Sequence, residues 1–475
     1  MMSAPLWSGE RLVAAMGARL DGAMPAAVTG ASIDTRTLEP GDVFFAITGE
    51  ARNGHDFVSG ALEKGAALAV VDEAHASQFA GLGSLAVVPD VLRAMEQAGS
   101  ARRAELTAKV VAVTGSVGKT GTKEALRLVL SRQGETHAPV ASYNNHWGVP
   151  LTLCRTPASV RYGVYEIGMN SPGEILPLAK LVRPHVAIIT TIQPVHLAAF
   201  ASLEGIAEEK ASVFWELEPG GTAIINADIP QSDLLRKLAE AGPAGRVISF
   251  GESADADIRL VSCALKADVS TVDAIVMGQP VTYRIGSPGK HIVLNSLGVL
   301  AVVHALGADL ALAALALGDL KPPAGRGAQQ TLQGPGGNFT LVDESYNGNP
   351  ASMRAAIENL GRLPVSGRGR RIAVLGDMLE LGPSGPDLHK GLAEAVSMNG
   401  VDKVFACGPL MRGLYDSLPS VVRGAYAAQA SGLEPLVLDA IRAGDVITVK
   451  GSLGSRMGPI VKAIMARFPT MPTDE

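Results

Sequence analysis

The stretch Lys109-Val-Val-Ala-Val-Thr-Gly-Ser-Val-Gly-Lys-Thr-Gly-Thr-Lys-Glu-Ala-Leu126 passes from a β-branched apolar run through a glycine-rich turn into an amphipathic segment. This order predicts a strand, a loop and a helix. Glycines let the backbone N–H groups of such a loop close around an anion, and the helix N-terminus adds its partial positive charge. The pattern predicts a phosphate-binding loop in which Lys119 pairs with the β- and γ-phosphates and the Thr120 hydroxyl holds Mg²⁺.

The loop departs from the full phosphate-loop pattern, because Val113 stands where that pattern has a glycine, five residues before Gly118. The shortened loop favours a variant class of ATP-binding loop over a switch GTPase or a motor. A plain strand-to-helix turn that happens to contain glycine and lysine is the alternative, and the order of the three elements argues against it. The residues expected to bind ATP here are Thr114, Gly115, Ser116, Val117, Gly118, Lys119, Thr120 and Gly121.

Composition limits the class of protein. A chain of 475 residues suggests about three domains of ~150 residues each. No apolar run approaches the ~18 residues that span a bilayer, and the N-terminus lacks a secretion signal, so we expect a cytoplasmic protein without membrane insertion. Three dispersed cysteines, Cys154, Cys263 and Cys407, exclude a disulfide framework and suggest small buried hydrophobes. A net charge of −5 and 4% aromatic residues argue against a nucleic-acid partner.

The chain divides into three α/β units. Residues 1–107 form a smaller N-terminal unit, with strands at 26–33, 43–47 and 67–71 and a helix at 56–64. Residues 108–326 alternate strands with helical patterns, which predicts a parallel sheet with ligands at the carboxyl ends of its strands. The expected central strands are 110–113, 163–166, 186–190, 222–225 and 246–250.

A Pro- and Gly-rich segment, 321–327, marks the second boundary. Residues 327–475 repeat the alternation and predict a doubly wound, Rossmann-like domain. Its expected strands are 340–342, 372–375, 404–406 and 446–449, and its expected helices are 352–360, 387–396, 436–443 and 455–466.

Two polar side chains follow strands of the central unit. Glu166 closes the apolar run 163–167, so its carboxylate is expected near the phosphate loop, where Mg²⁺ takes a hard oxygen ligand. His196 follows the strand at 186–190 and is placed to reach the same edge as a second metal ligand. Lys210 lies in a helical stretch of mixed charge, and by itself would be a solvated surface lysine.

These motifs, with others along the chain, resemble those of the Mur ligases. The Tyr-Asn-x-Asn-Pro and Gly-Asp-Met-Leu-Glu-Leu-Gly blocks favour the member that adds a dipeptide over its siblings. Four substitutions, at Asn53, Ile292, Glu344 and Gly348, depart from the family pattern without removing a phosphate or metal ligand. The motifs are 32–36, 40–46, 54–57, 114–120, 143–150, 166–174, 226–228, 343–350, 375–382 and 450–452, with His196, Asn295 and Arg326.

The resemblance implies an ATP-dependent ligase that joins D-alanyl-D-alanine to UDP-N-acetylmuramoyl-tripeptide in peptidoglycan precursor synthesis. No heptad repeat in the sequence demands assembly, so a monomer is expected. The N-terminal, central and C-terminal units would bind the UDP-sugar, ATP and the dipeptide respectively. Two Mg²⁺ ions are implied, one on Thr120 and Glu166 and one on His196, with Lys210 carbamylated to bridge metals. The resemblance also implies that the nucleotide is contacted at its base and ribose by Asn295 and Asp343, and at its γ-phosphate by Arg326. It implies contacts to the UDP-sugar from Thr35 and Arg36, and to the peptide from Asn144, Asn145 and His146. The implied contacts to the dipeptide are Tyr346, Asn347, Asn349, Asp377 and Glu380.

Such a ligase makes the peptide carboxylate reactive by forming an acyl phosphate. Lys119, Glu166, His196, Lys210 and Arg326 are the expected catalytic residues. The incoming ammonium group must lose a proton, and His389 or a carboxylate of the last domain is expected to assist. Asp377 and Glu380 have the alternative of capping a strand-to-helix turn.

Three other functions stay open. The chain can be a Mur-type ligase that adds a single amino acid, a folylpolyglutamate synthase, or a non-enzymatic switch that uses ATP only to change shape. The additional ligands Glu166, His196 and Lys210 argue against the switch.

Overall fold

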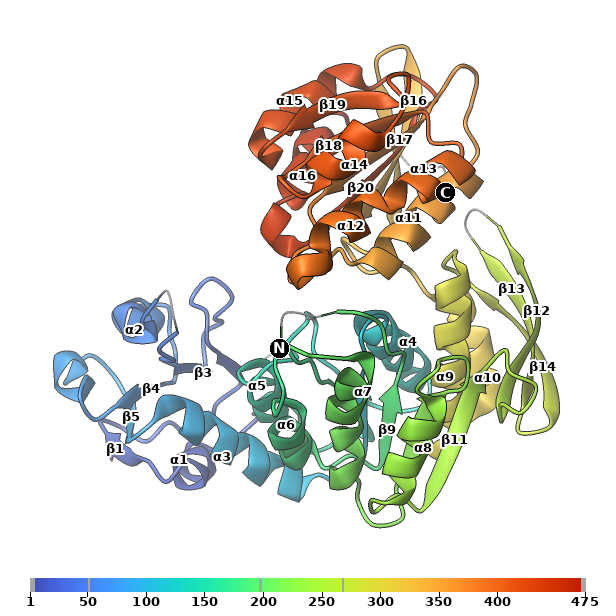
Figure 1. Cartoon of the computed structure of the whole chain (residues 1–475). Coiled ribbons are helices and arrows are strands. Elements are labelled where there is room, and N and C mark those ends of the chain that lie inside the picture. Colours follow the sequence, from blue (N-terminus) through green and yellow to red (C-terminus); the bar gives the residue numbers. More distant parts are fainter. Residues whose placement is uncertain (1–4, 50–51, 196–198, 267–268, 471–475) are drawn as a thin grey trace.

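The computed structural model describes residues 5–49, 52–195, 199–266 and 269–470 (Figure 1). These residues form three separate sheets of five, nine and six strands. Each sheet falls inside one of the three ranges expected from the sequence, and the exact domain limits stay a prediction. In the described part of the chain, no helix combines the length and the apolar character needed to cross a bilayer.

The N-terminal sheet has the order β1-β5-β4-β3-β2, with β1 antiparallel at one edge and the other strands parallel. The strands expected at 26–33, 43–47 and 67–71 are confirmed as β2, β3 and β4. Its apolar core also includes Leu151 and Cys154 of the central unit, so the two units share packing. The elements are α1 (Gly9–Ala15), β1 (Arg19–Asp21), β2 (Gly30–Ser32), β3 (Asp42–Phe45), α2 (Val58–Glu63), β4 (Leu68–Asp72), β5 (Leu85–Val88) and α3 (Val91–Glu105).

The central sheet has the order β14-β13-β12-β11-β10-β9-β6-β8-β7. Alternate residues of β6 point to opposite faces of the sheet. Val111 and Val113 pack toward α4 and α9, whereas Val110 and Ala112 pack toward α6, α7 and α8. The strands are β6 (Lys109–Thr114), β7 (Thr136–His137), β8 (Tyr162–Glu166), β9 (Val186–Ile189), β10 (Thr222–Asn226), β11 (Arg246–Gly251), β12 (Ile258–Leu265), β13 (Ser270–Val276) and β14 (Gln279–Ile285). The helices are α4 (Lys119–Ser131), α5 (Gly148–Cys154), α6 (Ile175–Val182), α7 (Leu203–Ala211), α8 (Ser232–Glu240), α9 (Lys290–Ala305) and α10 (Leu310–Ala316).

The central strands expected from the sequence are confirmed and run parallel. The sheet continues beyond them at one edge, where β12, β13 and β14 form an antiparallel meander. The turn between β13 and β14 consists of Met277 and Gly278, both with positive φ, as a two-residue hairpin with the right-handed strand twist requires. Methionine is an unusual residue for such a position, so the sequence carried only a weak turn signal.

The C-terminal sheet has the order β15-β16-β20-β17-β18-β19, and only β15 runs antiparallel. The helix expected at 436–443 instead begins at Ala430 and continues through Pro435. The helix expected at 387–396 is split in two at Gly391. The elements are β15 (Ala328–Gly334), β16 (Gly337–Glu344), α11 (Pro350–Arg362), β17 (Arg371–Gly376), α12 (Gly385–Lys390), α13 (Leu392–Met398), β18 (Lys403–Cys407), α14 (Met411–Ser417), β19 (Arg423–Ala427), α15 (Ala430–Ala440), β20 (Val446–Lys450) and α16 (Gly458–Arg467).

The C-terminal unit stands over the end of the central sheet, with α11 and α12 on its facing side (Figure 1). The loops after β6, β8 and β9 therefore face the loops after β16, β17 and β20. This arrangement places the carboxyl ends of two parallel sheets opposite each other, where α/β folds bind ligands.

Candidate active site

The glycine-rich loop turns tightly between β6 and α4. Gly115 has φ 143° and Gly118 has φ 89°. A Cβ atom on Gly115 would lie 1.9 Å from Thr190 Oγ1, and one on Gly118 would lie 2.8 Å from Asn295 Nδ2. The loop therefore requires glycine at both positions, for its backbone conformation and for the close approach of its neighbours.

Hydrogen bonds fasten this loop to the chain that follows β9. Thr190 Oγ1 donates to Val117 O at 2.5 Å, and Ser116 N donates to Thr191 O at 2.9 Å. Ser116 Oγ accepts from Gln193 N at 2.9 Å and donates to Gln193 O at 3.1 Å. The loop is thus held in its anion-binding shape by the protein itself.

We predict that Gly115→Ala destabilises the fold by roughly 2 kcal/mol, because the methyl group meets Thr190 in a strained backbone conformation. ATP affinity falls at least about tenfold, since the displaced loop no longer presents its N–H groups. Chemical denaturation and calorimetric titration with MgADP measure both effects. The control is Gly60→Ala in α2, where a Cβ meets nothing within 4 Å. Equal behaviour of the two variants would contradict the assigned role of the loop.

Lys119 begins α4 and curls back over the loop. Its Nζ donates to Gly115 O at 2.6 Å and to Ser116 O at 3.4 Å. Burial lowers the pKa of Lys119, Glu166 opposes this shift, and Arg326 adds to it. The ammonium group therefore contacts the loop carbonyls within electrostatic range of both charged residues, and a phosphate chain can replace the carbonyl contacts.

Glu166 and Thr120 lie side by side below the loop. Glu166, which is 1% exposed, accepts from Thr120 Oγ1 at 3.0 Å through Oε2 and from Asn144 Nδ2 at 2.7 Å through Oε1. Ser142 Oγ lies 3.3 Å from Thr120 Oγ1. A carboxylate and two hydroxyl groups are the hard oxygen donors that Mg²⁺ prefers. The donor set therefore fits the expected cation.

Lys210 is not the solvated surface residue that its sequence context alone suggested. It lies in α7 and is 1% exposed. Burial lowers the pKa of Lys210 well below its usual value, and the charge of Lys119 lowers it further. Both effects disfavour the charged form of the amine. His196 lies outside the described residues.

A cleft of about 680 Å³ separates the central and C-terminal units. It brings together residues from loops that are far apart in the sequence. The expected site residues that line it are Ser116, Val117, Gly118, Lys119, Thr120, Gly121, Asn144, Glu166, Asn295, Arg326, Tyr346, Asn347, Asn349 and Glu380. Among the described residues, those outside its lining are Thr35, Arg36, Thr114, Gly115, Asn145, His146, Lys210, Asp343 and Asp377.

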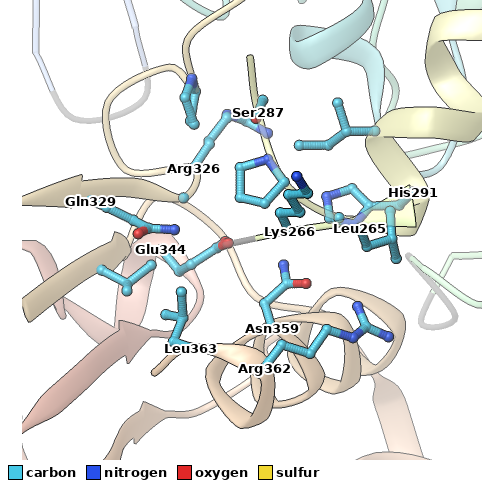
Figure 2. Close-up of a pocket in the computed structure, with 16 residues that line it drawn as sticks. Leu265, Lys266, Ser287, His291, Arg326, Gln329, Glu344, Asn359, Arg362 and Leu363 are labelled. Atoms are coloured by element: carbon cyan, nitrogen blue, oxygen red, sulfur yellow. The ribbon is translucent and has the colours of Figure 1, made fainter. Parts of the chain in front are cut away.

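Arg326 lies at the junction of the two units. Its guanidinium carbon is 4.4 Å from the centre of the Tyr346 ring. In Figure 2, Arg326 lies beside Ser287 of the central unit, and Glu344 of the C-terminal unit lies nearby. The side chain is therefore placed at the hinge, with its charge close enough to affect Lys119.

Lys450, which belongs to the motif at 450–452, and Glu344 also line the cleft. Lys450 Nζ lies 3.1 Å from Glu344 Oε2 and donates to Asn347 O at 2.9 Å. Ser452 Oγ accepts from Leu379 N and donates to Gly348 O, both at 2.9 Å. These bonds tie the three C-terminal loops into one cleft wall.

The expectation that His389 acts as a base is wrong. His389 is fully buried, its Nε2 accepts from Met378 N at 2.8 Å, and its Nδ1 donates to Gly385 O at 2.6 Å. Both ring nitrogens are therefore used, and burial lowers the pKa of the ring. His389 fixes the turn after β17 instead.

Three other residues expected to contact ligands have partners within the protein. The Asp377 carboxylate accepts from Met411 N at 2.7 Å and Leu410 N at 3.3 Å, which favours the capping alternative. Asp343 Oδ1 accepts from Ser345 N and Oγ, at 3.0 and 2.6 Å. Asn145 Oδ1 accepts from the backbone N–H groups that begin α5. Ligand contacts by these three residues stay predictions.

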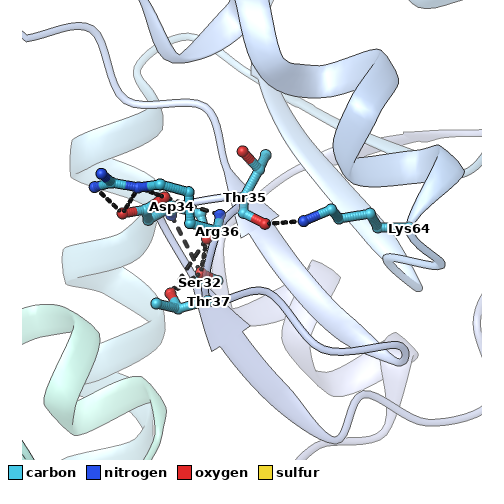
Figure 3. A network of polar contacts seen from close by, with 6 residues as sticks. All are labelled: Ser32, Asp34, Thr35, Arg36, Thr37 and Lys64. Atoms are coloured by element: carbon cyan, nitrogen blue, oxygen red, sulfur yellow. Dashed lines mark hydrogen bonds and ion pairs between the residues drawn. The ribbon is translucent and has the colours of Figure 1, made fainter. Parts of the chain in front are cut away.

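Thr35 and Arg36 lie on an exposed turn after β2 (Figure 3). The Arg36 side chain is 82% exposed, pairs with Asp34 at 2.6 Å and holds the pKa of Asp34 below its usual value. Lys64 Nζ donates to Thr35 O at 2.7 Å. The turn is thus ordered while its guanidinium stays accessible to an anionic ligand.

Comparisons with known proteins agree with this geometry. Family models described as "Mur ligase family, catalytic domain", "Mur ligase middle domain" and "Mur ligase, glutamate ligase domain" match residues 27–111, 113–303 and 329–453. The UDP-N-acetylmuramoyl-tripeptide--D-alanyl-D-alanine ligase of Escherichia coli is 33% identical over 91% of this chain and 92% of its own length. The protein of the same name from Rickettsia prowazekii is 28% identical, over 96% of this chain and 99% of its own length. A crystal structure of MurF from Acinetobacter baumannii has a TM-score of 0.83 and 28% identity, covering 98% of this chain and 100% of its own.

Proposed function

Because this chain belongs to the Mur ligase family, we propose that it is an ATP-dependent, ADP-forming ligase that adds D-alanyl-D-alanine to UDP-N-acetylmuramoyl-tripeptide. The reaction is a step in the synthesis of peptidoglycan precursors. The observation that carries the proposal is one cleft lined by a phosphate loop, a buried carboxylate and a hinge arginine. A switch protein that only binds ATP does not need the polar loops of a C-terminal unit opposite its phosphate loop.

The first half-reaction is phosphoryl transfer. The terminal carboxylate of the tripeptide attacks the γ-phosphorus in line, the bond to the β-γ bridging oxygen breaks, and ADP leaves with the acyl phosphate formed. Lys119 and Arg326 neutralise charge on the transferring group from two sides of the cleft. Mg²⁺, held by Thr120 and Glu166 when bound, neutralises the phosphate oxygens and orients them.

The second half-reaction forms the amide bond. The amine of D-alanyl-D-alanine attacks the acyl carbon, and inorganic phosphate leaves. Water must be kept out because it hydrolyses an acyl phosphate. The wall formed by Tyr346, Asn347, Glu380 and Ser452 covers the phosphate loop from the C-terminal unit and supplies this shelter.

Each unit has one substrate in this proposal. The N-terminal unit holds the UDP-sugar near Arg36, the central unit holds ATP, and the C-terminal unit brings the dipeptide to the cleft. Tyr346, Asn349 and Glu380 line the cleft and are the dipeptide contacts that we propose. Asn295 packs against Gly118 and is placed to contact the nucleotide. We expect the ligase to act as a cytoplasmic monomer.

Mass spectrometry of the product tests the function. The protein is incubated with UDP-N-acetylmuramoyl-tripeptide, D-alanyl-D-alanine and MgATP, and the expected product gains the dipeptide mass less one water. Parallel reactions contain single amino acids or a folate with glutamate. Addition of a single residue supports another family member, and ATP hydrolysis independent of both peptide substrates supports the switch.

We also propose that Lys210 is carbamylated. A carbamate forms only from a neutral amine, and burial lowers the pKa of Lys210 well below its usual value, which supports the proposal. Protein equilibrated with ¹³C-bicarbonate is expected to give one carbamate carbon signal that weakens as the pH falls, because protonation removes the nucleophile. Lys210→Met abolishes the signal and Lys180→Met, on exposed helix surface, keeps it. A signal that persists in Lys210→Met would contradict the assignment.

A further inference from the structure

Residues 138–147, here called the strap, connect β7 to α5 and cross the N-terminal end of α4. Near its middle, the strap places Ser142 Oγ 3.3 Å from Thr120 Oγ1, and Asn144 Nδ2 donates to Glu166 Oε1 at 2.7 Å. The backbone carbonyl of Asn144 also accepts from Gly168 N at 2.7 Å. The strap therefore contacts both residues assigned to Mg²⁺.

Lys123 fixes the start of the strap. This lysine lies in α4 and is 0% exposed. Its Nζ donates to Pro139 O at 2.6 Å and pairs with Glu124 Oε1 at 2.5 Å. Glu124 has a second partner, Arg127, at 2.8 Å. A buried ammonium group is costly, and neither half-reaction uses this one.

The far end of the strap is held by the N-terminal unit. A Cβ on Gly49 would lie 2.8 Å from the Trp147 ring, so the two residues are in close contact. Arg155 lies over the ring of Tyr143 and donates to Ala31 O at 2.6 Å. The strap is thus fixed at both ends, and these contacts add to the bond from Gly168 N in holding Asn144 against Glu166.

We propose that Lys123 is a positioning residue of the metal site, acting through the strap to hold the Asn144 amide against Glu166. This inference rests on the proposed function, because it concerns the same Mg²⁺ site. The amide of Asn144 occupies Oε1 and leaves Oε2 directed at Thr120. Partners that orient a metal ligand in this way contribute about 10- to 100-fold to metal affinity or activity.

The test compares Lys123→Met with Arg127→Met. Methionine keeps the apolar stem of Lys123 and removes its bonds to Pro139 and Glu124, whereas Arg127→Met removes only the other partner of Glu124. Mn²⁺ affinity is measured by electron paramagnetic resonance in the presence of ADP. This measurement does not depend on amide-bond formation. A failed ligase assay of the wild-type protein would therefore reject the proposed function without deciding the role of Lys123.

Lys123→Met is expected to weaken Mn²⁺ binding about tenfold and to raise the Mg²⁺ concentration for half-maximal activity similarly. Arg127→Met is expected to change both by less than about twofold. A purely structural role would lower the melting temperature while leaving Mn²⁺ affinity unchanged, and that result overturns the proposal.

A second variant covers the case in which Lys123→Met does not fold. Val140, in the strap beside Pro139, is 86% exposed. Val140→Gly loosens the strap without disturbing a core, and is expected to weaken Mn²⁺ binding about threefold. Unchanged affinity in this variant also overturns the proposal.

Discussion

Lys119→Ala is expected to lower kcat/KM for amide-bond formation by about 10³-fold or more, equivalent to roughly 4 kcal/mol of transition-state stabilisation. Lys119 is the cation that the phosphate loop itself supplies, and its Nζ lies within the curve of that loop. Its charge is most effective when the γ-phosphoryl group moves between oxygens. Steady-state assays of ADP release, dependent on both peptide substrates, measure the loss.

The control for this variant is Lys109→Ala, at the other end of β6, where the lysine is exposed. This change is expected to leave kcat/KM within about twofold of the original value. The melting temperature of Lys119→Ala is expected to stay near that of the unmodified protein, since Lys119 is only half-buried and lies outside the apolar core. Full ligase activity in Lys119→Ala would show that the triphosphate does not use this loop.

Arg326→Ala is expected to lower kcat by about 10³-fold, the effect of removing an arginine that stabilises a phosphoryl-transfer transition state. The residue lies on the segment between the two units and lines the cleft. We expect it to link ATP binding to closure of the C-terminal unit, so that its loss also weakens ADP binding. Pre-steady-state measurement of acyl-phosphate formation separates the two effects.

Arg412→Ala is a matched control. The guanidinium carbon of Arg412 lies 4.6 Å from the centre of the Tyr426 ring, in a contact similar to that of Arg326 with Tyr346. Both variants lose one cation–π contact, and Arg412→Ala also loses the pair of Arg412 with Asp416. Only Arg326→Ala is expected to lose activity. Equal kcat values for the two variants would remove Arg326 from the mechanism.

The phosphate loop was predictable because its determinants are local. The apolar run of β6, the glycines and the amphipathic pattern of α4 are contiguous, and each structural element follows from its own residues. Glu166 was predictable for a similar reason, since the end of a strand next to β6 must lie near the loop. The three-unit α/β fold followed from the same alternation of strands and helices, and is confirmed.

Other features depend on contacts that sequence patterns do not encode. His389 lost its expected role because its Nε2 accepts from Met378, on the turn after β17. The bond from Asn144 to Glu166 joins residues that are 22 positions apart. Lys210 has a charged helical context in the sequence, yet packing buries it. Periodicity cannot distinguish a buried lysine from a solvated one when the burial comes from other elements.

The most direct test of the central claim is a crystal structure with Mg²⁺, a non-hydrolysable ATP analogue and the UDP-tripeptide. We predict that the triphosphate binds in the loop of Gly115 to Thr120 and that Lys119 and Arg326 contact the γ-phosphate. The terminal peptide carboxylate is expected about 3–3.5 Å from the γ-phosphorus. A triphosphate bound outside this loop, or a carboxylate that cannot reach it, would contradict the account.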